Sequence, residues 1–413
     1  MNNDDIDVLF VGGLASENQI SAFQTNSRKG YQFAAQNLEE SIIRGVLENG
    51  ASLNVLSIPG VSTFPFGYKK MIIPPTDFIL NGKKYGKALG FVNLPFLNAP
   101  SRHTVDKYVD DWYADAKGKK AILVYSLNRY FVNFAVRLKQ RYKDIVIIAI
   151  VPDLPRYMGC NKFYKLFGFQ SRDISYIYQH VHIFDGFVVL TKDMIKDLKM
   201  EKKPNTVMEG IFSGTISSIS NNRKKEQIVL YTGNINRKYG INELLNAFEY
   251  VEDENIKLWI RGDGEMKCDI IKKMESDKRI KYIGPLSREE LVKIEAEASL
   301  LINPVSPRNE FTHYFFPSKT MNYLSTGKPV LMYKLPCLPE EYEKYLFFIE
   351  GEGPSNIASS ILSVLGKDNN ELIKKGETAQ HFIMKEKCAK VQCGKIMSLI
   401  DLVYENMNDY SYS

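Results

Sequence analysis

The sequence has little cysteine, little tryptophan and no long apolar run. Its 413 residues include five cysteines and two tryptophans. The cysteines are odd in number and no pair has zinc-site spacing, which favours a reducing compartment over a disulfide framework. No stretch reaches the roughly 18 uncharged apolar residues from which a membrane-spanning helix is built.

The first residues do not show the pattern that is typical of a secretory signal peptide. Asp4 and Asp5 stand where a signal peptide would have basic and then apolar residues. We therefore expect a cytoplasmic protein, and any contact that it makes with the inner face of the cell membrane would be peripheral.

The net charge is small but unevenly distributed. The chain carries 54 basic and 48 acidic residues, hence +6. Residues 1–212 hold 27 basic and 20 acidic residues, so this half carries +7. This excess favours an anionic partner, such as a phosphorylated acceptor or an anionic membrane surface. Nucleic acid is disfavoured because the lysines are scattered and no arginine-rich arm, zinc-finger spacing or RNA-binding motif occurs.

Short apolar runs alternate with amphipathic ones, which predicts two α/β domains with parallel sheets covered on both faces. In the first domain we expect strands at 7–13, 53–58, 121–125, 145–151 and 186–190, and helices at 30–50, 128–142 and 192–200. In the second we expect strands at 228–233, 256–260, 280–283, 299–302 and 329–332, and helices at 240–250, 287–297 and 318–326.

The polar stretch 213–226 is interpreted as the interdomain linker or a loop beside it. The expected domains are 1–212 and 213–389. The stretch 370–408 has a helical pattern, and a helix at about 390–413 is expected to return to the first domain. Because ligands bind at the carboxyl ends of strands in doubly wound sheets, we expect the site in a cleft between the two domains.

One candidate site is the loop Tyr231–Gly240, which follows a predicted strand and precedes a helix. Gly233 would let the backbone approach a ligand, and Gly240 would permit the turn into the helix. Arg237 and Lys238 lie between them, and two cations at a helix N-terminus suit a diphosphate. The alternative is an exposed basic loop.

Two further turns follow predicted strands. Trp259–Gly264 is a strand running into a glycine turn, a weak signal that also fits a plain turn. In Phe315–Val330, Pro317 and Ser318 begin a helix that Gly327 ends. We expect the backbone amides of Ser318, Lys319 and Thr320 to be unpaired donors for an anion, with Lys319 adding a full charge.

Several other motifs match a known site only in part. Asp5-Ile-Asp7 matches a metal motif but precedes its strand instead of following it. Gly327-Lys328 lacks the first glycine of a phosphate-binding loop, and the glycines of 262–264 lack the third glycine of a dinucleotide fingerprint. The five histidines form no metal-ligand spacing, and no nucleophile elbow occurs.

The surviving blocks, in order, are Y-T-G-x5-Y-G-I, R-G-D-G-E, Y-I-G-P-L and F-P-S-K-T-M-x-Y-L-S-T-G-K-P-V. Together they resemble the donor domain of family 4 retaining glycosyltransferases of the GT-B fold, among them bacterial enzymes of capsule and exopolysaccharide assembly. The similarity covers about 228–350. It implies two Rossmann-like domains facing across a cleft, and transfer of a hexose with retention from a nucleotide diphosphate sugar, UDP-linked, to a glycan or lipid-linked acceptor.

The resemblance also assigns residues. It places the loop at Gly233 and the turn at Gly262 by the donor's phosphates and sugar, the segment Gly284–Leu286 at the nucleobase, and the helix from Pro317 at the diphosphate. The donor-binding residues implied by the motifs are Gly233, Asn234, Gly240, Arg261, Gly262, Gly264, Pro285, Leu286, Glu310, Tyr314, Phe316, Pro317, Ser318, Thr320 and Asn322.

Two glutamates of the family, eight residues apart, are replaced here by Tyr314 and Asn322; Glu310 is the nearest carboxylate to the first. The predicted catalytic residues are Arg237, Lys238 and Lys319, which would stabilise the departing diphosphate. The resemblance implies no essential metal or other cofactor, and a donor phosphate oxygen that helps to deprotonate the acceptor. The alternatives are a sugar-nucleotide epimerase and a non-catalytic partner subunit.

The acceptor is expected on the first domain. Asp153, at a strand end, is a candidate for orienting the donor sugar or the acceptor, or else a turn residue. The aromatic and basic run Lys162–Phe169 favours a lipid diphosphate sugar at a membrane surface. An ordinary core helix with solvated lysines is the alternative.

Overall fold

The computed structural model describes residues 6–28, 33–95, 97–159, 162–214, 225–284 and 286–411. Most of the expected linker and Pro285 therefore lie outside the described residues. The chain divides into two units. Unit 1 comprises Met1–Ser213 and Cys388–Ser413, and unit 2 comprises Gly214–Lys387. The expected boundaries lie within two residues of these.

Unit 1 is built on an eight-stranded sheet of order β10-β9-β8-β7-β1-β2-β5-β4, parallel except for β4, which is antiparallel to β5. Its strands are β1 (Ile6–Gly12), β2 (Ser52–Ser57), β4 (Thr76–Leu80), β5 (Lys83–Ala88), β7 (Lys119–Tyr125), β8 (Val146–Val151), β9 (Gly186–Val189) and β10 (Asn205–Val207). A separate antiparallel pair is formed by β3 (Ile72–Ile73) and β6 (Phe91–Val92).

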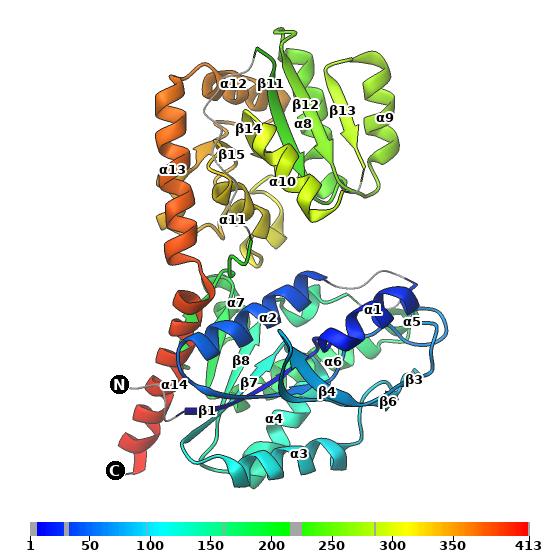
Figure 1. Ribbon diagram of the computed structural model, residues 1–413, viewed down its shortest axis with the longest axis vertical. Coiled ribbons are helices and arrows are strands. Elements are labelled where there is room, and N and C mark those ends of the chain that lie inside the picture. Colours follow the sequence, from blue (N-terminus) through cyan, green and yellow to red (C-terminus); the bar gives the residue numbers. More distant parts are fainter. Residues whose placement is uncertain are drawn as a thin grey trace. The chain divides into compact units, whose positions relative to one another are not determined.

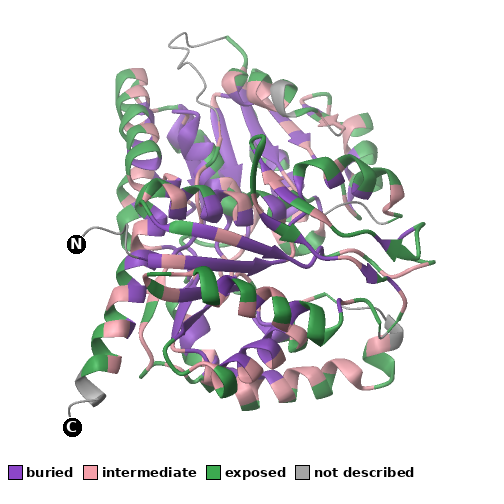
Figure 2. Cartoon of the chain, turned by 60° about the horizontal axis from the view of Figure 1, so that its bottom comes forward, coloured by how far each residue is buried: buried purple, intermediate pink, exposed green. Residues whose placement is uncertain are grey.

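The helices of unit 1 cover both faces of this sheet (Figure 1). They are α1 (Glu17–Asn26), α2 (Phe33–Glu48), α3 (Arg102–Asp115), α4 (Arg129–Arg141), α5 (Lys162–Leu166), α6 (Phe169–His180), α7 (Lys192–Asp197) and α14 (Ala389–Ser411), with 3₁₀ turns at Pro155–Tyr157 and Val181–Ile183. The central strands are buried over most of their length (Figure 2), as expected for a sheet covered on both faces.

Helix α14 belongs to the core of unit 1 although it lies at the far end of the sequence. Ile396 and Ile400 are fully buried in the same apolar cluster as Ile42 and Val46 of α2. The two helices approach so closely at Gly45 that a Cβ there would come within 2.4 Å of the backbone oxygen of Ala389. The crossing therefore depends on a residue without a side chain.

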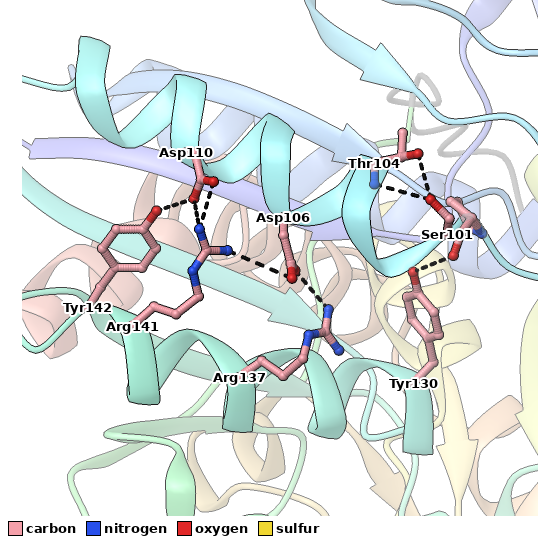
Figure 3. Close-up of polar contacts among 9 residues, drawn as sticks. Ser101, Thr104, Asp106, Asp110, Tyr130, Arg137, Arg141 and Tyr142 are labelled. Carbon is pink, nitrogen blue, oxygen red and sulfur yellow. Dashed lines mark hydrogen bonds and ion pairs between the residues drawn. The ribbon is translucent and has the colours of Figure 1, made fainter.

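Helices α3 and α4 are held together by ion pairs along their length (Figure 3). Arg137 of α4 donates to Asp106 of α3 at 2.9 Å, and Arg141 donates to Asp110 at 2.5 Å. At the other end of the pair, the Tyr130 hydroxyl donates to the backbone oxygen of Pro100 at 3.2 Å. These contacts fix the segment before α3 against α4.

Unit 2 contains a six-stranded parallel sheet of order β13-β12-β11-β14-β15-β16. Its strands are β11 (Gln227–Thr232), β12 (Ile256–Arg261), β13 (Ile280–Ile283), β14 (Leu300–Asn303), β15 (Val330–Met332) and β16 (Phe347–Phe348). Its helices are α8 (Ile241–Ala247), α9 (Lys267–Ser276), α10 (Arg288–Glu297), α11 (Ser318–Ser325), α12 (Pro354–Leu365) and α13 (Asn369–Glu386), with 3₁₀ turns at Arg237–Tyr239, Phe248–Tyr250, Glu310–His313 and Glu340–Tyr345.

The predicted fold class is confirmed: both units are α/β with parallel sheets. The helical pattern expected over 370–408 is confirmed and consists of two helices, since α13 ends at Glu386 and α14 begins at Ala389. The helices over 192–200 and 240–250 are shorter than predicted, ending at Asp197 and Ala247.

Candidate functional site

The sheet of unit 2 reverses its strand order between β11 and β14. In sequence order its six strands read 3-2-1-4-5-6, the order of dinucleotide-binding domains. At that point the connections after β11 and β14 leave the sheet in opposite directions. This opens a crevice, which is where ligands of such sheets bind. The loop after β11 is the predicted Tyr231–Gly240 motif.

The turns after β11 and β12 pack directly against each other. Gly233 has φ 140° and Gly262 has φ 152°. A Cβ on Gly262 would come within 1.7 Å of the Gly233 carbonyl oxygen, so no side chain fits there. The Gly233 N–H donates to the Arg261 carbonyl, and the Ile235 N–H donates to the Asp263 carbonyl. The glycines of both motifs thus join the two turns into one platform at the carboxyl ends of the strands.

Lys319 of α11 reaches this platform. Its Nζ donates to the Tyr231 hydroxyl at 2.8 Å and lies 4.1 Å from the centroid of that ring. The Tyr239 ring is 5.6 Å away. A Cβ on Gly233 would come within 2.9 Å of Nζ, so this glycine leaves room for the ammonium. Burial lowers the pKa of Lys319 to about 7.

Of the other two predicted cations, Lys238 lies over the Tyr239 ring, as Lys319 does, whereas Arg237 is paired on the surface. The Arg237 side chain, 62% exposed, pairs with Asp269 at 2.8 Å, and the Arg237 backbone N–H donates to the Glu265 carboxylate at 2.9 Å. Lys238 Nζ lies 5.1 Å from the Tyr239 ring centroid. In this structure the positive charge next to Gly233 therefore comes from Lys319, while Arg237 is engaged on the surface.

Helix α11 begins at Ser318 with Pro317 as its N-cap, as the sequence predicts. The expectation that three amides are unpaired is wrong for Thr320, whose N–H donates to the Pro317 carbonyl at 2.7 Å. The N–H groups of Ser318 and Lys319 open the helix, where no intrahelical acceptor exists. An anion at this end would also gain from the helix dipole.

Arg261 joins the β12 turn to the loop that the resemblance places at the nucleobase. Its Nη2 donates to the Leu286 carbonyl at 3.1 Å, while its Nε is buried without a partner among the described residues. Behind it lies Glu295 of α10, which accepts a bond from Thr232 Oγ1 at 3.4 Å. Burial raises the pKa of Glu295 to about 7.

The remaining predicted donor-binding residues divide between surface and core. Asn322 is exposed on α11, whereas Phe316 is buried with its ring 5.3 Å from that of Tyr342. The Thr320 hydroxyl is directed to Met332 Sδ at 3.7 Å, within the core. Asn234 (exposed), Gly240 (buried), Gly264 (half-buried), Glu310 (exposed) and Tyr314 (half-buried) lie in the loops at the carboxyl edge.

Sequence reasoning missed Asn303, the last residue of β14. Its side chain is fully buried, and neither Oδ1 nor Nδ2 has a hydrogen-bond partner among the described residues. A buried amide without partners is costly, so such a group calls for an explanation beyond stability. Its position at the strand-order reversal is the signal that could have identified it.

Unit 1 also gathers ionisable groups at the carboxyl edge of its sheet. Glu39 of α2 is buried and accepts the Gly13 N–H at 2.8 Å, and burial raises its pKa to about 8. Burial also raises the pKa of Tyr125, at the end of β7, and the negative charges of Glu39 and Asp153 act in the same direction. The sequence predicted Asp153; Glu39 lies on the buried face of α2, three residues before Ile42, a spacing that could have identified it.

Within the described residues, no group of three or more His, Cys, Asp or Glu side chains could hold a metal ion. In the same part of the chain, no helix combines the length and the apolar character that crossing a membrane requires.

Residues 213–382 match the family model of glycosyl transferases group 1. Unit 2 is thus similar to glycosyl transferases group 1 over nearly its whole length. The match ends within α13 and contains the glycine platform, Lys319 and α11. No match was found among curated protein sequences.

Solved structures of glycosyltransferases match nearly the whole chain. The sucrose-phosphate synthase of Thermosynechococcus elongatus has a TM-score of 0.62 at 12% identity, over 97% of this chain and 100% of that one. The lipopolysaccharide outer core galactosyltransferase WaaB has 0.61 at 10%, over 95% and 99%. TarM from S. aureus, in a complex with UDP, has 0.55 at 11%, over 95% and 99%. The fold of the chain is therefore GT-B.

Proposed function

We propose that the protein is a retaining glycosyltransferase that moves a hexose from a UDP-linked donor to a glycan or lipid-linked acceptor in surface polysaccharide assembly. The observation that carries the proposal is the convergence of Lys319, the first turn of α11 and the Gly233–Gly262 platform at the carboxyl edge of unit 2. The match of this unit to group 1 glycosyl transferases supports it.

The chemistry of the proposed site concerns the leaving group. When the bond between the sugar and the diphosphate breaks, negative charge develops on the diphosphate oxygens. A cation and backbone amides that face the diphosphate stabilise that charge. One such contact typically lowers the activation free energy by roughly 2.7–4 kcal/mol. Lys319 would supply the cation, and the amides of Ser318 and Lys319 would supply the donors. Arg237 would stabilise the leaving group only if its guanidinium separated from Asp269.

Two matched structures support the proposed UDP-linked donor and the proposed retention of configuration. The TarM complex contains UDP. Trehalose-6-phosphate synthase, also matched by this fold, is described in a study of glycosyl transfer with retention. In unit 1, the carboxyl edge with Glu39 and Asp153 would take the acceptor. At neutral pH Glu39 is mostly protonated, so it could donate a hydrogen bond to an acceptor oxygen.

The first test is a panel of nucleotide sugars screened for protection of the purified chain against thermal unfolding. A ligand that binds only the folded protein raises the melting temperature. We expect UDP-sugars to raise it. No protection by any member of the panel would contradict the proposal.

The second test is Lys319→Ala, with Lys334→Ala as the matched control. Lys334 is an exposed lysine of unit 2 that pairs with Glu343 at 2.7 Å. We expect Lys319→Ala to lower turnover at least about a hundredfold, the loss of one such contact, and Lys334→Ala to leave it unchanged. Normal turnover of Lys319→Ala would remove the proposed role.

A second candidate function rests on Tyr314 and Asn322, which stand where the family has two glutamates. Neither side chain is a carboxylate, which favours a non-catalytic subunit that acts as the binding partner of a true transferase. No binding of UDP or GDP in calorimetry would support this alternative. Release of a changed sugar in the absence of an acceptor would instead indicate an epimerase.

A further inference from the structure

Three segments of unit 1 lie at the carboxyl edge of its sheet because of the way the strands are connected. The described parts of these segments are residues 60–75 after β2, residues 91–95 and 97–102 after β5, and residues 162–172 after β8. The strands β2, β5 and β8 run parallel within one sheet, so their carboxyl ends share an edge. We call these three segments the rim. Figure 1 shows β3, β6 and α5, which belong to them, on the same side of unit 1.

The rim carries the most exposed apolar side chains of the described chain. Phe66 is 83% exposed, Leu166 78% and Phe167 67%, and Ile72 and Leu97 follow at 61% each. No other large apolar side chain in the described residues exceeds these five. A concentration of such side chains along one edge is typical of an interaction surface.

The rim around Phe66 and Ile72 is held in place by hydrogen bonds. The Phe64 N–H donates to the Asn93 carbonyl at 3.1 Å, and the Asn93 N–H donates to the Met71 carbonyl at 2.7 Å. Strands β3 and β6 pair directly through Ile72 and Val92. The two segments thus present their apolar side chains from a paired backbone, so that this exposure is built into the fold.

The charge of the rim has one sign. Its 38 residues include six cations, Lys69, Lys70, Arg102, Lys162, Lys165 and Arg172, and no aspartate or glutamate. At the average density of acids in the chain, 48 in 413, about four would be expected. Among the described residues, Lys70, Lys165, Arg102 and Arg172 are exposed and no carboxylate forms an ion pair with them.

We propose that the rim docks unit 1 on an anionic lipid surface. Exposed apolar side chains among cations are what the interface of an anionic bilayer binds, because the chains enter the headgroup region while the cations meet lipid phosphates. A second copy of the chain fits less well, since a two-fold contact would bring the same positive surfaces together. The inference deepens the proposed function and rests on it for the acceptor: a lipid-linked sugar would lie at the edge that carries Glu39 and Asp153.

The test is co-sedimentation of the full chain with vesicles of neutral phosphatidylcholine and with vesicles that also contain phosphatidylglycerol. We expect binding to the anionic vesicles that weakens as salt is raised from about 0.05 to 0.5 M, since charges near the surface are screened. The triple variant Phe66→Ser, Leu166→Ser, Phe167→Ser should bind at least about tenfold more weakly. Its control is Tyr250→Ser with Ile271→Ser, two exposed apolar side chains of unit 2.

A second variant tests the charge. Lys70→Gln with Lys165→Gln should weaken binding by about fivefold for each cation at low salt. The control is Lys202→Gln with Lys272→Gln, which removes two exposed lysines outside the rim. Unaltered melting temperatures of all variants establish that they fold.

The outcomes separate the possibilities. No binding to either vesicle, or equal loss in the rim and control variants, would overturn the proposal. A dimer in analytical ultracentrifugation that the triple variant dissociates, without vesicle binding, would identify a second copy as the occupant. Vesicle binding by a chain that binds no nucleotide would leave this inference standing while the proposed function fails.

Discussion

The environment of Lys319 predicts that the donor binds together with a proton. The pKa of this lysine is lowered from 10.5 to about 7 because its Nζ lies against the Tyr231 ring, away from water. At pH 7 about half of the molecules therefore carry the charge. A diphosphate contacting Nζ would hold the ammonium form, because an opposite charge at short range favours the charged state. Each molecule that binds the diphosphate would then carry Lys319 in its protonated form.

The magnitude follows from that pKa. A pKa lowered from 10.5 to about 7 corresponds to about 5 kcal/mol of differential stabilisation of the neutral amine. Only the protonated fraction binds, so the apparent affinity falls in proportion to it. Between pH 7 and pH 9 this fraction falls from about one half to about one hundredth, and we expect affinity to fall about 50-fold. Proton uptake should rise from about 0.5 to nearly 1 per nucleotide over the same range.

Calorimetry measures both quantities when titrations with UDP are repeated in two buffers of different ionisation enthalpy. The phosphates of UDP are essentially ionised in this range. Lys319→Met should bind more weakly and independently of pH, and Lys334→Met should behave as the wild type. An affinity that stays constant from pH 7 to 9 with no proton uptake would refute this reasoning.

Three further predictions concern stability. Gly262→Ala should lower the free energy of unfolding by about 2–4 kcal/mol, because its Cβ would overlap the Gly233 carbonyl at a backbone φ of 152°; Gly284→Ala, with open space around it, should change little in the same denaturant titration. Glu39 keeps its proton in the folded protein up to about pH 8, so stability should fall as pH rises from about 5 to 8, and Glu39→Gln should flatten that slope in melting curves. Asn303→Leu should raise the melting temperature of the unliganded protein by removing two unpaired polar atoms, and lower its affinity for UDP if this amide contacts the nucleotide; a lower melting temperature would contradict the first part.

The parallel sheets of both units could be predicted because their central strands are short apolar runs. Val146–Val151 is buried along its whole length, and such a run is typical of a strand covered on both faces. The short pair β3–β6 could not be predicted in this way. Its exposed Ile72 and Val92 break the pattern of buried runs, and it depends on backbone pairing between segments distant in the sequence.

The break between α13 and α14 lies near the boundary predicted at 389, but the helical pattern over 370–408 does not itself mark it. Both helices have an apolar face, and no proline or glycine separates them; Lys387 stands at the break. It is buried with Nζ 2.5 Å from Glu341 and 4.8 Å from the centroid of the Tyr342 ring. A lysine does not indicate the end of a helix, so these tertiary contacts carried no signal in the local sequence.

For the candidate site, the sequence located the loops better than the side chains. The glycine turns and the start of α11 lie where the motifs indicate. The direction of Arg237 was not predictable, because Asp269 lies 32 residues away and only the fold brings the two together. Glu39 and Asn303 were missed for a similar reason: burial, which gives them their unusual state, is a property of the folded chain.

The central claim is that a diphosphate is held where α11 meets the glycine platform, and a crystal structure of the chain with UDP tests it most directly. We predict phosphate oxygens within hydrogen-bonding distance of Lys319 Nζ and of the Ser318 or Lys319 amide, beside Gly233. A nucleotide bound elsewhere on the chain, with Lys319 still directed only at Tyr231, would contradict the claim.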